Sequence, residues 1–236
     1  MRFWWRDDDA IEPTSALDRL LDLSERLQTP VHLAVIPQRA KDTLAYTVAQ
    51  HQSVVVFVHG WSHSNRSLSG EKKSEFGGLR PDTLTLLKKS LYTMSQHFGG
   101  CLANVFVPPW NRISPDILPL LVKVGYTGLS TYGPRSTHMP SSGLVQVNTH
   151  VDPINWRKGG GLINPEELVA RLTDQLTGRR LGQLDNEEPL GLLTHHLVHT
   201  PALWHFVEEL LQTLLECDAE PIRLCNPEAW SYRRRQ

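Results

Sequence analysis

VVVFVHGWSH, the sequence of residues 54–63, predicts a buried strand that ends in a pair of histidines. The first five residues are apolar and four of them are β-branched, which is typical of a strand buried on both faces in a parallel sheet. His59 and His63 follow where the strand ends and its loop begins. Parallel α/β folds place their chemistry at this end of their strands, and imidazole is a common zinc ligand. Exposed loop histidines are the alternative interpretation, because this spacing alone is a weak pattern.

Apolar segments alternate with helical patterns on both sides of residues 54–58. We expect further strands near residues 3–5, 31–36, 103–107, 127–131, 144–148 and 190–193, and helices near residues 14–28, 40–50, 80–98, 114–125, 164–179 and 200–217. This alternation is typical of successive βαβ units, which form a parallel sheet. The predicted fold class is therefore α/β with a parallel sheet, and the chain length fits one domain over residues 1–236.

The composition is ordinary for a globular protein, since 40% of the 236 residues are hydrophobic and 21% are charged. The formal net charge of -1 gives no reason to expect nucleic acid or an anionic membrane as a partner. No segment approaches the apolar length of a membrane span, and we find no secretory signal. The three cysteines form no C-x-x-C pair and suit a reducing compartment. We therefore expect a cytoplasmic protein.

Three consecutive acids, Asp7, Asp8 and Asp9, follow Arg6 at the end of the first expected strand. Adjacent carboxylates repel, so inside a fold they need a cation, which a divalent metal or Arg6 would supply. An acidic helix N-terminus is the alternative, because aspartate favours first turns. The alternative is weakened because the next helical pattern begins only at Thr14.

Three more polar clusters lie at or near strand ends further along the chain. They are Val107-Pro108-Pro109-Trp110, Asp152-Pro153-Ile154-Asn155-Trp156 and Leu193-Thr194-His195. With the acids and the histidine pair, they make five motifs in a fixed order. This order resembles the polysaccharide deacetylases, the chitooligosaccharide-deacetylase homology family of metal-dependent carbohydrate esterases. The resemblance spans residues from about 5 to 199.

The resemblance implies a distorted (β/α)7–8 barrel of parallel strands, with one catalytic domain over residues 1–236. It also implies a role for several residues. In that family an aspartate pair ends the first strand, and its first acid is the base while its second acid binds the metal. The histidine pair that completes the metal ligands corresponds to His59 and His63. The fifth motif makes His195 the general acid, with His196 and His199 as alternatives.

Two registers of the acid run fit the family's aspartate pair. Asp7 is the base and Asp8 the ligand in one register, and Asp8 is the base and Asp9 the ligand in the other. We favour the second register because of the distance to Pro13-Thr14. An Arg-x-Asp-Asp form in some deacetylase relatives points the same way.

The sequence departs from the family pattern at two positions. The arginine that usually begins the third motif and orients the base is Val107 here. Arg6 or Arg112 could supply the missing charge, and we favour Arg6 because it adjoins the acids. Asn155 replaces the second acid of the fourth motif, so any charge that this acid lent to a histidine is lost.

The resemblance predicts a metal-dependent hydrolase that removes an acetyl group from the nitrogen of an acetylated sugar or small glycan. The expected cofactor is a divalent metal, zinc in the first place, with cobalt or nickel as alternatives. Substrate contacts are expected from residues of the motif loops, namely Trp61, Pro109, Trp110, Asp152 and Trp156, although buried packing is the alternative for each tryptophan. Two other functions stay open: a relative that binds metal or glycan without turnover, and a hydrolase of a non-sugar amide.

Overall fold

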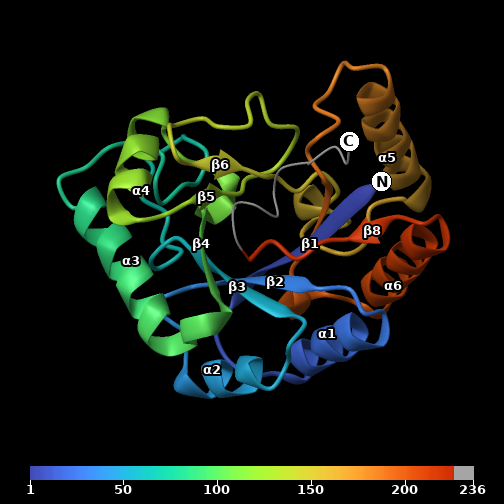
Figure 1. The fold of residues 1–236 in the computed structure, drawn as a ribbon, viewed down its shortest axis with the longest axis horizontal. Helices are drawn as coiled ribbons and strands as arrows, with labels where there is room; N and C mark the ends of the chain where they lie inside the picture. The colour runs from blue at the N-terminus through green and yellow to red at the C-terminus, as the bar shows by residue number, and fades with distance from the viewer. Residues whose placement is uncertain (226–236) are drawn as a thin grey trace, which may run out of the picture.

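The structure is a computed structural model that describes residues 1–225 of the chain, and its centre is a parallel sheet (Figure 1). The strands are β1 (Arg2–Ala10), β2 (Val31–Val35), β3 (Val54–His59), β4 (Leu102–Val107), β5 (Gly128–Leu129), β6 (Val145–Gln146), β7 (Leu190–Thr194) and β8 (Glu220–Pro221). Their order is β6-β5-β4-β3-β2-β1-β7, with β8 paired to β1 beside it. Every strand pair is parallel, which confirms the predicted α/β class.

Helices connect the strands and lie around the rim of the sheet in Figure 1. The α-helices are α1 (Ser15–Arg26), α2 (Asp42–Ala49), α3 (Thr83–Phe98), α4 (Leu118–Val124), α5 (Pro165–Arg180) and α6 (Pro201–Glu216). Short 3-10 turns are η1 (Gly99–Cys101), η2 (Pro109–Asn111), η3 (Pro115–Ile117), η4 (Trp156–Lys158) and η5 (His196–Val198). Among residues 1–225, none of the helices combines the length and apolar character needed to cross a bilayer.

An irregular segment, residues 149–151, joins the two ends of the sheet. Thr149 bridges to Tyr132 beyond β5, and Val151 bridges to Leu192 of β7. A Cβ atom added to Gly191 of β7 would lie 2.5 Å from the carbonyl oxygen of Asn148, so this close approach requires glycine. The sheet therefore curls into the distorted barrel that the sequence predicted.

The two faces of the sheet bury different sets of side chains. The outer face packs against the helices in a large apolar cluster that includes Leu33 and Val56. The inner face carries a smaller cluster, in which Trp4 and Phe57 lie among valines and alanines. Beyond this inner cluster, toward the carboxyl ends of the strands, side chains on the same face point to one common site.

The first strand is longer than the sequence indicated. We expected residues 3–5 to form it and the acids to follow it, but β1 continues through the acids to Ala10. Asp7 pairs with Leu33 of β2 and with Thr194 of β7, so its backbone is a full part of the ladder. The acids tolerate this burial because their carboxylates have the partners described below. By contrast, β5 and β6 are only two residues long, shorter than expected, and β8 was not expected.

Candidate metal centre and active site

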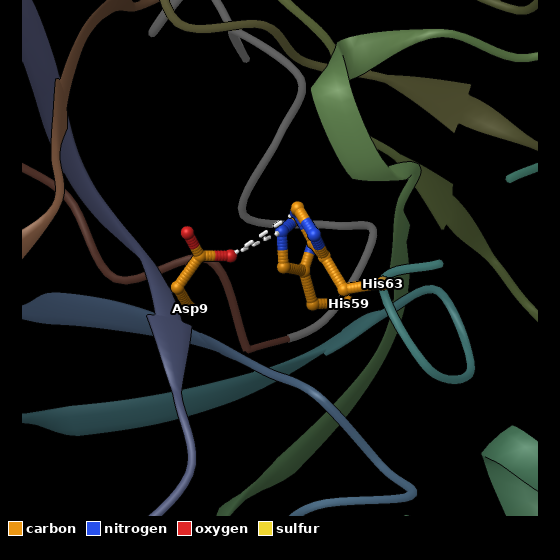
Figure 2. Close-up of side chains that lie close together, drawn as sticks. All are labelled: Asp9, His59 and His63. Carbon is orange, nitrogen blue, oxygen red and sulfur yellow. Dashed lines mark ion pairs between the residues drawn. The ribbon is translucent and has the colours of Figure 1, made fainter. Parts of the chain in front are cut away.

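Asp9, His59 and His63 meet beyond the carboxyl ends of β1 and β3. Asp9 Oδ1 lies 3.2 Å from His59 Nε2 and 3.3 Å from His63 Nε2. Figure 2 shows the Asp9 carboxylate facing both imidazole rings. One ligand atom from each side chain lies within 4.8 Å of the other two. Within residues 1–225, no other group of three such side chains meets this spacing.

A bulge in β1 directs Asp9 toward the histidines. Asp8 and Ala10 pair with consecutive residues of β2, Ala34 and Val35, so Asp9 is an extra residue in the ladder. Its φ angle is 75°, in the left-handed region that non-glycine residues rarely adopt. Bulges re-aim side chains at active sites in this way. In a regular strand Asp9 would point to the face opposite Asp8.

His59 is oriented by the main chain of the neighbouring strand. Its Nδ1 donates to the carbonyl oxygen of Val107 at 3.0 Å, so Nε2 is the ring nitrogen that faces Asp9 and that a bound cation would use. Val107 stands where the family has its arginine, and its side chain is buried in the inner cluster. The residue therefore contributes to the site through its backbone.

The loop that carries His63 is held by Glu75, a residue that the sequence analysis missed. The buried Glu75 carboxylate accepts hydrogen bonds from the backbone N–H groups of Trp61, Ser62 and His63, and from the Ser62 hydroxyl. A Cβ atom added to Gly60 would lie 2.4 Å from Glu75 Oε2, so the approach needs glycine there. Glu75 lies in a polar loop, where the sequence gives no sign of a buried acceptor.

Strained backbone is concentrated at this site. Among residues 1–225, six non-glycine residues have a positive φ angle. Four of these six belong to or adjoin the candidate metal centre, namely Asp9, His63, Trp110 and Asn111. Each such conformation costs on the order of 1–3 kcal/mol, so it persists only where the surrounding structure imposes it.

A divalent cation fits the three side chains. Asp9 Oδ1 is buried and makes no hydrogen bond, although two imidazoles lie next to it. One carboxylate and two imidazoles are a donor set that zinc and similar ions use, with positions left for water and substrate. Burial by itself would raise the pKa of Asp9, but contact with His59 and the charges of the nearby histidines hold it well below its usual range. Asp9 is therefore an anion, as a ligand must be.

Asp8 lies beside this group and is bound by Arg6. Arg6 Nε is 2.8 Å from Asp8 Oδ1, and Arg6 Nη2 is 3.0 Å from Asp8 Oδ2, a bidentate pair. Both residues are almost completely buried. The guanidinium also donates to the Ser130 hydroxyl, the Thr131 carbonyl and the Asn111 side chain. All five N–H groups of Arg6 are therefore used, which fixes the orientation of Asp8.

Arg112, the other arginine considered for this role, is bound to a loop and not to the acids. Its Nη1 donates to the carbonyl oxygen of Lys73 in the long loop before α3, at 2.7 Å. The arrangement of the acids is that of the second register, with Asp9 at the histidines and Asp8 on Arg6. Geometry alone assigns no catalytic role to either acid.

Asp7 points to the other face of β1 and pairs with His196. Its carboxylate lies 2.5 Å from His196 Nδ1, and it accepts hydrogen bonds from the His196 backbone N–H and the Thr194 hydroxyl. Burial opposes ionisation of Asp7, but the charge and hydrogen bond of His196 outweigh it and lower the pKa of Asp7. Burial likewise lowers the pKa of His196, but the Asp7 charge and hydrogen bond outweigh it and raise that pKa. Asp7 therefore secures the turn that carries His195.

His195 lies on the opposite side of the site, next to Trp156. The two rings are 4.8 Å apart in an edge-on arrangement, and the Trp156 indole N–H donates to Asp152 at 2.8 Å. Burial raises the pKa of Asp152, and the positive charge of His195 opposes this shift. The structure therefore brings His195, Trp156 and Asp152 together.

His199 lies apart from these residues. Its ring packs edge-on against Trp204 of α6 at 4.5 Å, and burial lowers its pKa to about 4. His196, the other alternative acid, is bound to Asp7. The two alternative acids therefore differ from His195 in their surroundings.

The remaining predicted contact residues have different environments. Trp110 packs its ring 4.3 Å from that of His63 and is half-buried. Pro109 is buried against Gly60. Trp61 is only 9% exposed and belongs to the apolar core, with the Lys89 ammonium over its ring. Of the two roles considered for Trp61, packing fits its burial, and the expected substrate contact stays a prediction.

Solved structures with the same fold include several carbohydrate esterases. A family 4 carbohydrate esterase from Streptomyces lividans, in complex with acetate, has a TM-score of 0.63 and 14% identity, covering 98% of this chain and 96% of that chain. A family 4 acetyl xylan esterase from Clostridium thermocellum, in complex with a cobalt ion, has a TM-score of 0.56 and 15% identity, covering 93% and 86%. A CE4 family pseudoenzyme from Bacillus anthracis has a TM-score of 0.59 and 14% identity, covering 93% and 62%.

These likenesses confirm the fold inferred from the five motifs. No protein-family model and no curated protein matches the sequence. The fold of this chain is that of the CE4 polysaccharide deacetylases, and the low identities are those of a divergent chain. Since enzymes and a pseudoenzyme share this fold, the activity must be argued from the site.

Proposed function

We propose that the protein is a metal-dependent hydrolase that deacetylates the nitrogen of an acetylated sugar or small glycan. The observation that carries the proposal is the meeting of Asp9, His59 and His63 at one point, with Asp8 fixed beside them. The similar fold of a carbohydrate esterase solved with acetate supports an acetylated substrate. The reaction belongs to the hydrolysis of carbon–nitrogen bonds other than peptide bonds.

Each residue has a distinct task in this proposal. Asp8, held by the buried Arg6, takes a proton from the attacking water. His195 gives a proton to the departing amine from the opposite side. A divalent cation held by Asp9, His59 and His63 supplies Lewis acidity for the acetyl carbonyl when it is bound. Zinc is our first expectation, and cobalt or nickel would suit the same ligands.

The surroundings of the site suit a sugar. Trp110 beside His63 and Trp156 beside His195 offer aromatic surfaces next to the two groups of catalytic interest. Trp156 is 51% exposed, so its ring is accessible for stacking. Asp152 holds the Trp156 indole and offers a carboxylate to substrate hydroxyls.

A relative without turnover is the second candidate. Val107 and Asn155 depart from the family pattern, and a pseudoenzyme shares the fold. The Arg6–Asp8 pair speaks for activity, because it returns a positive charge to the base that Val107 does not supply. A cytoplasmic location also stays a prediction, and the three free cysteines agree with it.

Acetate release separates the two candidates. Purified protein is incubated with acetylated chitooligosaccharides, nucleotide-linked acetylated sugars and a non-sugar acetamide, with and without added zinc or cobalt. We expect metal-dependent acetate release from at least one sugar, and its loss in His63→Ala. His205→Ala, on the exposed face of α6, is the matched control. Metal binding without acetate release from any substrate would favour the binding protein, and release from the acetamide alone would favour a non-sugar amidase.

A further inference from the structure

A groove lined by basic residues lies next to the candidate metal centre. Its volume is about 550 Å³, and it runs between the loop before α3 and the segment that follows Trp110. Four cations line the groove, namely Arg66, Lys72, Arg80 and Arg112, against one carboxylate, that of Glu71. For a chain with a net charge of -1, this is a marked local excess of positive charge.

Most of this charge is not neutralised by carboxylates. Arg80 donates to the carbonyl oxygens of Glu75 and Arg66 at 2.9 and 2.6 Å, and Arg112 donates to that of Lys73 at 2.7 Å. Carbonyl groups are neutral, so these bonds fix the guanidinium groups in place without cancelling their charge. Within residues 1–225, the ion pair between a groove cation and a carboxylate is that of Arg66 with Asp82, at 2.7 Å, and the Asp82 charge also acts on Arg80. The lining is therefore preorganised for an anion.

The groove and the candidate metal centre share one short segment of chain. Trp110 packs on the metal-site residue His63, and Asn111 binds Arg6. Arg112 and Ile113, the next two residues, line the groove. On the other side, Glu75 holds the His63 loop, while its backbone carbonyl is bound by Arg80 of the groove. The groove therefore borders the two segments that carry Trp110 and hold the His63 loop.

We propose that this groove binds an anionic oxyacid group, phosphate or carboxylate, carried by the substrate. The substrate is then an acetylated sugar with an acidic substituent, and not a neutral glycan. This inference rests on the proposed deacetylation. Arg80 and Arg112, whose guanidinium groups are held by carbonyl oxygens, suit the recognition of phosphate or carboxylate oxygens.

Direct binding tests the groove without any requirement for turnover. Isothermal titration calorimetry on the full zinc-loaded chain compares N-acetylglucosamine, its 6-phosphate and N-acetylglucosaminuronate. We expect tighter binding of at least one acidic ligand, and a loss of about tenfold in its affinity in Lys72→Glu, which corresponds to about 1.4 kcal/mol. The affinity for the neutral sugar is expected to be unchanged. The acidic ligand whose affinity falls more in Lys72→Glu shows whether the groove prefers phosphate or carboxylate.

Lys73→Glu is the matched control, because it makes the same charge change at the next residue, which lies outside the groove lining. We expect less than about a twofold change there, since exposed charges are screened by solvent. Arg112→Gln keeps a donor for the Lys73 carbonyl and should weaken the acidic ligands alone. Two results would overturn the proposal that the groove binds an acidic group. One is an equal loss of affinity in Lys72→Glu and Lys73→Glu, and the other is that acidic ligands bind no more tightly than the neutral sugar. Acetate release from neutral sugars would still stand in that case, so the two proposals fail separately.

Discussion

The two faces of β1 carry the same kind of pair in different settings. On the inner face Asp8 is bound by Arg6, and on the outer face Asp7 is bound by His196. All four side chains are almost completely buried, so each pair compensates a carboxylate that would otherwise be costly. The inner pair lies beside Asp9, a proposed metal ligand, whereas the outer pair anchors the turn that carries His195.

The difference shows how consecutive acids acquire separate functions. The Asp7 carboxylate already accepts hydrogen bonds from the Thr194 hydroxyl and the His196 backbone, besides its contact with the His196 ring. The bonds to Asp8 come from the Arg6 guanidinium, whose two parallel N–H···O contacts hold the carboxylate in one orientation. Side-chain alternation separates the two acids, and the bulge at Asp9 returns the third acid to the active side.

The largest expected effect separates the ligand from the base. Asp9→Asn should lose both bound metal and turnover, because the site loses its anionic ligand. Asp8→Asn should keep the metal and lose about 10²–10⁴-fold in turnover, the typical contribution of a general base. Metal content by atomic absorption and acetate release measure both. Metal loss in Asp8→Asn with retention in Asp9→Asn would reverse the assignment of the two acids.

Breaking either of these two buried pairs should lower the free energy of unfolding of the protein. Arg6→Met and Asp7→Asn each remove a partner from a buried pair, which typically costs about 3–5 kcal/mol. Thermal denaturation and urea titration measure the loss. Arg26→Met, which removes an exposed pair with Glu208, is the control and should change stability by less than about 1 kcal/mol. Equal stability of Arg6→Met and the parent would show that the inner charge pair contributes nothing net.

A third test concerns His32 of β2, which pairs with Arg6 of β1 and faces the inner side of the sheet. Its Nδ1 donates to the Trp5 carbonyl and its Nε2 accepts from the Leu224 N–H, so the ring is neutral. Burial lowers the pKa of His32 from 6.5 to about 4. Below pH 6.5 the unfolded chain therefore takes up a proton that the folded chain does not, and stability falls with pH by about 3 kcal/mol down to pH 4.

Urea titrations between pH 7 and pH 4 measure this acid limb. His32→Gln retains a donor and an acceptor but has no titrating group, so its stability should fall less steeply with decreasing pH. His205→Gln, on the exposed surface of α6, should keep the parent slope. The same slope in His32→Gln as in the parent would assign the acid sensitivity to other groups, of which half-buried His199 is the first candidate.

The smallest expected effect concerns the loop outside β1. Glu75→Gln keeps the shape of the side chain but turns one acceptor oxygen into a donor, so the loop that carries His63 loses part of its anchorage. Partners that orient metal ligands are typically worth 10–100-fold in metal affinity, and we expect a loss in that range. Ser62→Ala removes one of the four bonds to Glu75 and is the milder comparison. Zinc competition with a chromogenic chelator measures both, and unchanged affinity in Glu75→Gln would leave it a purely structural residue.

The sequence by itself determined the parallel α/β sheet and the site's position on it. Hydrophobic strands such as residues 54–58 must be buried on both faces, and a parallel sheet brings the carboxyl ends of its strands to one edge. The sequence therefore predicts that the histidines after this strand and the acids at the end of the first strand lie on the same side of the molecule. The choice of Arg6 over Arg112 as the arginine beside the acids was made from the sequence because Arg6 adjoins them, and Arg6 is bound to Asp8.

Only the tertiary structure decided which acid meets the histidines, what holds their loop and where Trp61 lies. The bulge at Asp9 breaks the side-chain alternation, and its φ angle of 75° depends on contacts from other strands. Glu75 and Trp61 are ordinary residues of a polar loop and a motif, and their burial follows from segments that pack over them. Local patterns report the period of a strand or helix, whereas a bulge or a buried carboxylate is set by neighbours distant in sequence.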